Sequence, residues 1–325
     1  MSTRLILVDG IIGSGKSTTA QWLYRLLSEH GVPAVWHHEQ DVGHPLYEHH
    51  QLEAAARLSG EACLAFHRAA LGRWQTVADR AGSEPVVVLE SSFLQAPVAS
   101  MHLSGCAPEA IVEQVGRTAR VVDALRPLLV YLRPHDVAAS VRWICEQRGP
   151  EFVDYLRDTI SATPYGARRA PVETAAVTVF IEELAVLFDE TVASLGLEVL
   201  TADAGREPWE TVRRRIAARL GVPVAGTVEP LVPAGDPSAF AGRYRDTEHD
   251  QELTVVLGDD GLRLASGARL LPTAPDTFDL EGLSVELTFE HDGDVAERIR
   301  CQTRLANLGS IWERVQDVDG AGRRT

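Results

Sequence analysis

The segment Gly10-Ile-Ile-Gly-Ser-Gly-Lys-Ser17 constrains this chain more than any other feature of its sequence. It follows a short apolar run at residues 5–8 and precedes residues 18–30, whose apolar side chains recur at helical spacing until Gly31. A glycine-rich turn between a buried strand and a helix directs backbone N–H groups at an anion, and the helix dipole adds to the attraction. The segment predicts a phosphate-binding loop, or P-loop, whose nucleotide-binding residues are Gly10, Gly13, Ser14, Gly15, Lys16, Ser17 and Thr18.

Lys16 is the single lysine of the chain, which has 30 arginines. A compact ammonium reaches the β- and γ-phosphate oxygens in a way that a planar guanidinium does not. In a P-loop the following hydroxyl, here that of Ser17, ligates Mg²⁺. We therefore expect ATP and Mg²⁺ as cofactors.

Residues 1–222 alternate short apolar runs with longer amphipathic stretches, which predicts an α/β domain with a parallel sheet covered by helices on both faces. We expect strands at residues 5–8, 35–38, 86–89, 128–132 and 197–201. We expect helices at residues 18–30, 51–82 (one or two helices), 109–125, 135–147, 174–195 and 208–220.

The chain changes character after this domain. Residues 223–237 are rich in proline and predict a linker, and residues 238–319 show short strands at hairpin spacing, which indicates a small antiparallel β-barrel or sandwich. Residues 320–325 are expected to be a disordered tail. The net charge of −15 is concentrated in residues 223–325, which hold 10 basic and 19 acidic side chains.

This acidity makes nucleic acid and membrane surfaces poor partners, because both repel a negatively charged protein. No apolar run approaches the ~20 residues of a membrane span. The four cysteines are scattered and indicate reduced thiols. We expect a cytoplasmic protein whose partner is a small-molecule acceptor, and the sequence leaves open whether it forms a homodimer.

Four further segments follow the P-loop in order: Trp36-His-His-Glu-Gln-Asp41, Ala65-Phe-His-Arg68, Leu89-Glu-Ser-Ser92 and Arg142-Trp-Ile-Cys-Glu-Gln-Arg-Gly-Pro-Glu151. With the loop, they make residues 3–222 similar to the thymidylate kinase and deoxynucleoside kinase group of P-loop kinases. The resemblance implies transfer of the γ-phosphoryl group of ATP to a hydroxyl or phosphate of a small acceptor, with a nucleoside or nucleotide as the first choice.

The resemblance assigns two carboxylates at strand ends. Glu39 corresponds to the base that accepts the proton of the attacking hydroxyl, and Asp41 is a close rival for that role. Glu90 corresponds to a residue that binds Mg²⁺ or its water beside the acceptor, with Ser17 as the second ligand. Ser91 stands where the family has an arginine.

The resemblance also assigns Arg142 and Arg148 to a lid whose arginines neutralise the charge on the transferred phosphoryl group. Phe66, His67 and Arg73 correspond to the helix that packs on and recognises the nucleobase. His67 replaces the family's glutamine, so the resemblance does not imply which base is bound.

The tail, over residues 238–302, is similar to the lipocalin-like β domain appended to some serine β-lactamase-like hydrolases, a resemblance carried by Gly242-Arg-Tyr-Arg and the hairpins after it. It holds no catalytic set of residues. Two alternatives to a nucleoside or nucleotide kinase remain open: a kinase of a non-nucleotide metabolite or antibiotic, and a nucleotide-gated binding module without turnover.

Overall fold

The computed structural model describes residues 3–81, 85–169, 173–203, 205–223, 236–246, 248–305 and 310–315. The chain divides into two compact units, Met1–Ala225 and Gly226–Thr325, and each is described by itself. Residues 224–235 of the predicted linker and the predicted tail, residues 320–325, lie outside the described residues.

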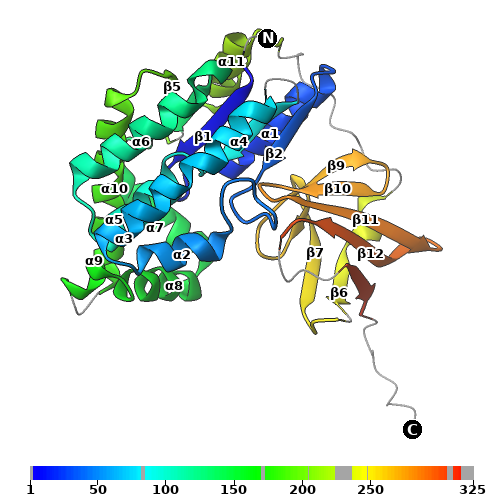
Figure 1. The fold of residues 1–325 in the computed structure, drawn as a ribbon. Helices are drawn as coiled ribbons and strands as arrows, with labels where there is room; N and C mark the ends of the chain where they lie inside the picture. Colours follow the sequence, from blue (N-terminus) through cyan, green and yellow to red (C-terminus); the bar gives the residue numbers. More distant parts are fainter. Residues whose placement is uncertain are drawn as a thin grey trace. The chain divides into compact units, whose positions relative to one another are not determined.

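The first unit contains a five-stranded parallel sheet with the strand order β2-β3-β1-β4-β5 (Figure 1). The strands are β1 (Leu5–Gly10), β2 (Ala34–His37), β3 (Val86–Glu90), β4 (Leu128–Leu132) and β5 (Glu198–Ala202). The α-helices are α1 (Lys16–Glu29), α2 (His49–Ala56), α3 (Gly60–Ala69), α4 (Leu71–Ala81), α5 (Gln95–Ser104), α6 (Pro108–Val122), α7 (Val137–Arg148), α8 (Pro150–Ser161), α9 (Pro164–Ala167), α10 (Thr174–Ser194) and α11 (Trp209–Leu220). A short 3₁₀ helix, η1 (Asp123–Leu125), precedes β4.

Both faces of this sheet are buried, and β1 shows how. Leu5 and Leu7 pack into a core formed with α2 to α6 and α10, whereas Ile6 and Val8 pack into a second core formed with α1 and α11. Alternate side chains of a strand point to opposite faces, so a strand covered on both faces must be apolar throughout. This explains why the inner strands read as continuous apolar runs.

The parallel sheet, its helices on both faces and the glycine loop from β1 to α1 define a P-loop NTPase fold, which confirms the predicted fold class. One or two helices were expected over residues 51–82, and the structure has three over residues 49–81, because the chain breaks twice. The first break is at Ser59, whose hydroxyl accepts the Ala62 N–H at the start of α3, and the second is at Ala70, between α3 and α4. Helices α5 and α8 were not predicted from the sequence, and both matter for the site.

The second unit is an eight-stranded antiparallel sheet that nearly closes into a barrel, as predicted. Its strands are β6 (Gly242–Asp246), β7 (Glu252–Gly258), β8 (Gly261–Leu264), β9 (Leu270–Ala274), β10 (Thr277–Leu280), β11 (Val285–Asp292), β12 (Val295–Thr303) and β13 (Ile311–Arg314), after a 3₁₀ helix, η2 (Pro237–Phe240). Consecutive strands pair, β13 returns to β6, and an isolated bridge between Arg263 and Arg269 joins the β8 and β9 ends.

Aromatic side chains fill the interior of this unit. Phe240, Phe278 and Phe289 meet edge to face with ring centroids 5.1–5.4 Å apart. The Arg314 guanidinium lies over the Tyr244 ring and donates hydrogen bonds to the Tyr244 hydroxyl at 2.9 Å and to backbone carbonyls of residues 239 and 241. The resemblance to a lipocalin-like domain stays a prediction. Among the described residues of both units, no helix combines the length and the apolar character that crossing a bilayer requires.

The predicted boundary near residue 222 can be tested with a fragment of residues 1–225. Val222 is the last residue of the first unit's apolar cores, so the fragment retains both cores, and a chain of this length buries enough surface to fold alone. We expect a single cooperative urea transition, measured by circular dichroism. A fragment that is insoluble or unfolds without a transition would contradict the boundary.

Candidate active site

The P-loop turns between the end of β1 and the start of α1, and its glycines are sterically required. Gly10, Gly13 and Gly15 have φ values of 155°, 77° and 86°. A Cβ atom on Gly10 would lie 2.2 Å from the Leu132 carbonyl oxygen, and one on Gly15 would lie 2.6 Å from the Trp209 ring. Substitution at these positions would therefore displace the loop from the sheet edge.

Lys16 is almost fully buried, and its Nζ donates a hydrogen bond to the Ile11 carbonyl at 2.8 Å, across the loop. Burial lowers the pKa of Lys16, and the nearby carboxylates of Glu39, Glu90 and Asp9 raise it in part. The ammonium thus lies within electrostatic reach of carboxylates from β1, from β3 and from the loop after β2.

The two predicted metal ligands lie together. Ser17 Oγ donates to Glu90 Oε1 at 2.5 Å, while Glu90 Oε2 is buried and makes no hydrogen bond to the described residues. His38 Nε2 lies 3.9 Å from Oε2. Burial, and next the Glu39 carboxylate, raise the pKa of Glu90 to about 8. A hydroxyl beside an unsatisfied carboxylate oxygen fits Mg²⁺, which prefers oxygen ligands and retains water.

The structure separates the two rival carboxylates that follow β2. Glu39 is half-buried and lines a cavity. Asp41 is buried, and its Oδ2 accepts the His38 backbone N–H at 3.1 Å, so it folds back on the turn and does not line the cavity.

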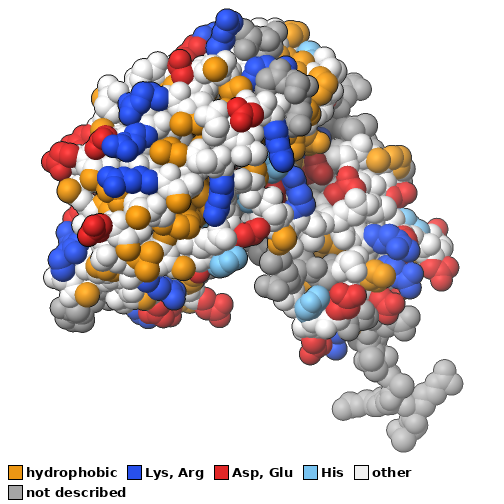
Figure 2. Space-filling view, viewed as in Figure 1, with side chains coloured by type: hydrophobic (Ala, Val, Ile, Leu, Met, Phe, Trp, Pro, Cys, Tyr) orange, Lys and Arg blue, Asp and Glu red, His pale blue; other side chains and the backbone are white. Residues whose placement is uncertain are grey.

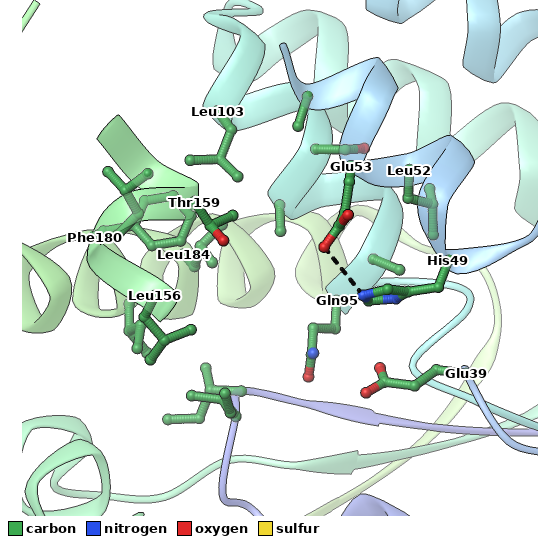
Figure 3. A pocket seen from close by; sticks show the side chains of 18 of the residues that line it. Glu39, His49, Leu52, Glu53, Gln95, Leu103, Leu156, Thr159, Phe180 and Leu184 are labelled. Atoms are coloured by element: carbon green, nitrogen blue, oxygen red, sulfur yellow. Dashed lines mark ion pairs between the residues drawn. The ribbon is translucent and has the colours of Figure 1, made fainter. Parts of the chain in front are cut away.

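The cavity has a volume of about 230 Å³ and adjoins the P-loop through Ile11 and Ile12. Its walls come from the P-loop, the segment after β2, α2, α5, α7, α8 and α10. Figure 3 shows Glu39, His49, Glu53 and Gln95 on one side, with Leu52 beside them, and mainly apolar side chains, with Thr159, on the other. The cavity is therefore a candidate acceptor site whose polar side includes the predicted base.

Of the two predicted lid arginines, Arg148 lines the cavity and Arg142 does not. Arg148 is the last residue of α7, and its guanidinium lies 4.8 Å from the centre of the Phe152 ring. A Cβ atom on Gly13 would lie 3.0 Å from Ile144, so α7 packs directly against the P-loop. Arg142 is exposed on the same helix. Figure 2 colours the Lys and Arg side chains blue and the Asp and Glu side chains red on one face of the molecule.

The structure does not bring Phe66, His67 and Arg73 to the cavity. His67 packs behind α5, where its Nε2 lies 2.7 Å from Ser100 Oγ. Phe66 packs on the apolar core, and Arg73 donates to the Leu46 carbonyl and to a side-chain amide of α2. The physical reason is that α5, which was not predicted from the sequence, forms this wall of the cavity in place of α3.

Asp9 belongs to the site, although no sequence motif singled it out. Its fully buried carboxylate accepts the backbone N–H groups of Phe93, Leu94 and Gln95 at 3.1, 3.0 and 2.8 Å. Burial raises the pKa of Asp9 to about 6, and these hydrogen bonds oppose the rise. Asp9 thereby fixes the start of α5 and brings Gln95 to the cavity. The sequence feature that could have identified Asp9 is its position as an acidic residue near the end of an apolar strand.

No family model and no curated protein matches this sequence. Among solved structures, the YorR protein of Bacillus subtilis in complex with phosphorylated GDP is 16% identical, with a TM-score of 0.38, and the match covers 67% of this chain and 95% of that one. Deoxyadenosine kinase from M. mycoides with bound dATP is 12% identical, with a TM-score of 0.38, and the match covers 67% of this chain and 99% of that one.

The position of His67 predicts a pH dependence of stability. Burial lowers the pKa of His67 to about 4 from 6.5, so the folded state favours the neutral ring. The contribution of the neutral ring to the free energy of unfolding is complete above pH 6.5 and is lost as the pH falls toward 4. Between pH 7 and pH 5 the free energy of unfolding should therefore fall by about 2 kcal/mol. We expect urea unfolding to show this loss in the wild type but not in His67→Gln.

His135→Gln removes an exposed histidine and is the matched control, which should keep the wild-type dependence. An equal loss of stability in wild type and His67→Gln between pH 7 and pH 5 would show that His67 is not held neutral.

Proposed function

We propose that the first unit is an ATP- and Mg²⁺-dependent phosphotransferase that transfers the γ-phosphoryl group of ATP to a hydroxyl group of a small molecule bound in the cavity. One observation carries the proposal: the P-loop ammonium, the Ser17–Glu90 pair and the Glu39 carboxylate meet where the loop adjoins the cavity. A phosphate-binding loop alone would support nucleotide binding; a carboxylate on the cavity wall beside it supports chemistry on a second substrate.

Lys16 would bind the β- and γ-phosphate oxygens, since it is the buried ammonium of the loop. Ser17 Oγ and the Glu90 carboxylate would hold Mg²⁺, which when bound neutralises charge that develops on the phosphate oxygens. Glu90 Oε2 supports this assignment, because it makes no hydrogen bond to the described residues, and a buried carboxylate oxygen that makes none is costly unless a cation or a water completes it.

Glu39 would accept the proton of the acceptor hydroxyl. It is the carboxylate of the β2 segment that reaches the cavity, whereas Asp41 is engaged with its own turn. Lys16 lies close enough to Glu39 to interact electrostatically with it, which would keep the base next to the transferred group. Arg148, on the cavity wall at the end of α7, would neutralise the charge of that group.

Substitution of Glu39 tests the proposal. Glu39→Gln keeps the size of the side chain but removes its basicity, so we expect kcat for ADP formation to fall by roughly 10²–10⁴-fold with ATP affinity unchanged. Glu61→Gln, a change at an exposed carboxylate of α3, is the matched control and should leave kcat unchanged. The rate is measured by coupled ADP release, and the affinity by calorimetry.

Lys16→Ala should instead abolish ATP binding, so the two variants distinguish the role of Lys16 in nucleotide binding from the role of Glu39 as the base. An acceptor-dependent rate in Glu39→Gln equal to that of the wild type would contradict the assignment of the base, and ATP affinity in Lys16→Ala within threefold of the wild type would contradict the nucleotide site.

A further inference from the structure

The cavity has two chemically different halves. Glu39, His49, Glu53 and Gln95 lie on one side (Figure 3). The opposite side consists mainly of aliphatic and aromatic side chains from α5, α8 and α10, together with the hydroxyls of Ser100 and Thr159. The apolar side chains include Leu103, Leu156, Ile160, Val177, Phe180 and Leu184. A ligand that fills this cavity must therefore place an apolar body against one wall and its polar groups against the other.

The polar side chains of the described residues in the apolar half offer little for recognition. Ser100 Oγ donates its proton to the Pro97 carbonyl at 3.0 Å and accepts the hydrogen bond from His67 Nε2, so it has no proton left to donate to a ligand. The other hydroxyls here are those of Thr159 and Tyr155 on α8, and the Tyr155 hydroxyl is engaged with Glu53. The amide, ring nitrogen and carbonyl groups of a nucleobase would meet apolar carbon here, and each unsatisfied polar group costs free energy on burial.

Several polar side chains besides Glu39 line the cavity, namely Gln40, His44, Tyr47, Ser92, Gln95 and Arg148, and Gln95 offers a recognition group for a ligand. Gln95 Oε1 is buried and makes no hydrogen bond to the described residues, so it can accept one from a ligand. Glu53 is already engaged, because its Oε1 accepts the Tyr155 hydroxyl at 3.0 Å and lies 3.5 Å from His49 Nε2. The backbone N–H of Gln95 donates a hydrogen bond to the Asp9 carboxylate, which fixes the position of this residue at the cavity.

We propose that the acceptor is a small amphiphilic alcohol, with its reacting hydroxyl at Glu39, a second polar group that donates to Gln95 Oε1, and an aliphatic or aromatic body against the apolar wall, rather than a nucleoside. This inference rests on the proposed function. The hydroxyl oxygen bonds to the γ-phosphorus of ATP, the bond from that phosphorus to the β–γ bridging oxygen breaks, ADP leaves with the electron pair, and the hydroxyl proton passes to Glu39.

A series of straight-chain primary alcohols from butanol to octanol tests, on the full chain, the reacting hydroxyl and the apolar body of this ligand. Each methylene that moves from water to the apolar wall should lower KM about three- to fourfold until the cavity is full. Thymidine and deoxyadenosine are the nucleoside probes, and we expect a kcat/KM for each at least tenfold below that of the best alcohol. Higher kcat/KM for a nucleoside, with no trend along the alcohol series, would overturn the inference.

A variant of the apolar wall provides the structural control. Ala99 lines the cavity from α5, so Ala99→Leu should reduce its volume and raise KM for the longest accepted alcohol at least tenfold, with KM for ATP unchanged. Ala218→Leu makes the same change on the exposed face of α11 and should change neither value. Equal KM values for the longest alcohol in both variants would contradict an apolar binding site at this wall.

Calorimetric binding of the same alcohols without ATP separates this inference from the proposed function. Binding that strengthens along the series, without transfer of phosphate from ATP, would support the ligand class and contradict the phosphotransferase. Transfer to a nucleoside with no alcohol binding would support the phosphotransferase and contradict the ligand class.

Discussion

The burial of the Lys16 ammonium among carboxylates is the interaction on which the rest of the site depends. Removing an ammonium from water costs several kcal/mol, and the cost is offset only where opposite charges and hydrogen bonds surround it. Here the carboxylates of Asp9, Glu39 and Glu90 and the Ile11 carbonyl provide that surrounding. Because they come from three neighbouring strands or the loops after them, the charge cluster exists only when β2, β3 and β1 are paired in register.

Asp9 connects this electrostatic cluster to the acceptor cavity. Its carboxylate faces the P-loop ammonium and also accepts three backbone N–H groups at the start of α5. The helix that carries the cavity wall is thus held by a residue of the strand that carries the P-loop. The P-loop cluster and the shape of the cavity therefore depend on the same few hydrogen bonds, although α5 and β1 are far apart in the sequence.

The features that could be predicted from the sequence are those with local causes. The P-loop, the five strands and the pairing of Ser17 with Glu90 follow from glycine positions, apolar runs and the rule that parallel strands end at one sheet edge. The part of the cavity wall formed by α5 could not be predicted in this way, because α5 is apolar around most of its circumference and shows no helical periodicity. The apolar side chains of α8 do recur at helical spacing after Pro150, so this helix had a signal in the sequence. The missing α5 also explains why the sequence misplaced His67. This residue lies on the expected helix but faces α5 instead of the cavity. Whether Glu39 or Asp41 lines the cavity depended on a turn that the sequence does not specify.

The central claim is that the charge cluster transfers phosphate to a hydroxyl in the cavity. The most direct measurement incubates the full chain with Mg²⁺, ATP labelled with ³²P at the γ-phosphate and a mixture of primary alcohols, and then separates the labelled products. We expect label in an organic phosphate ester, and no such ester with Lys16→Ala. Label that stays in ATP, or that appears only as inorganic phosphate, would contradict the claim.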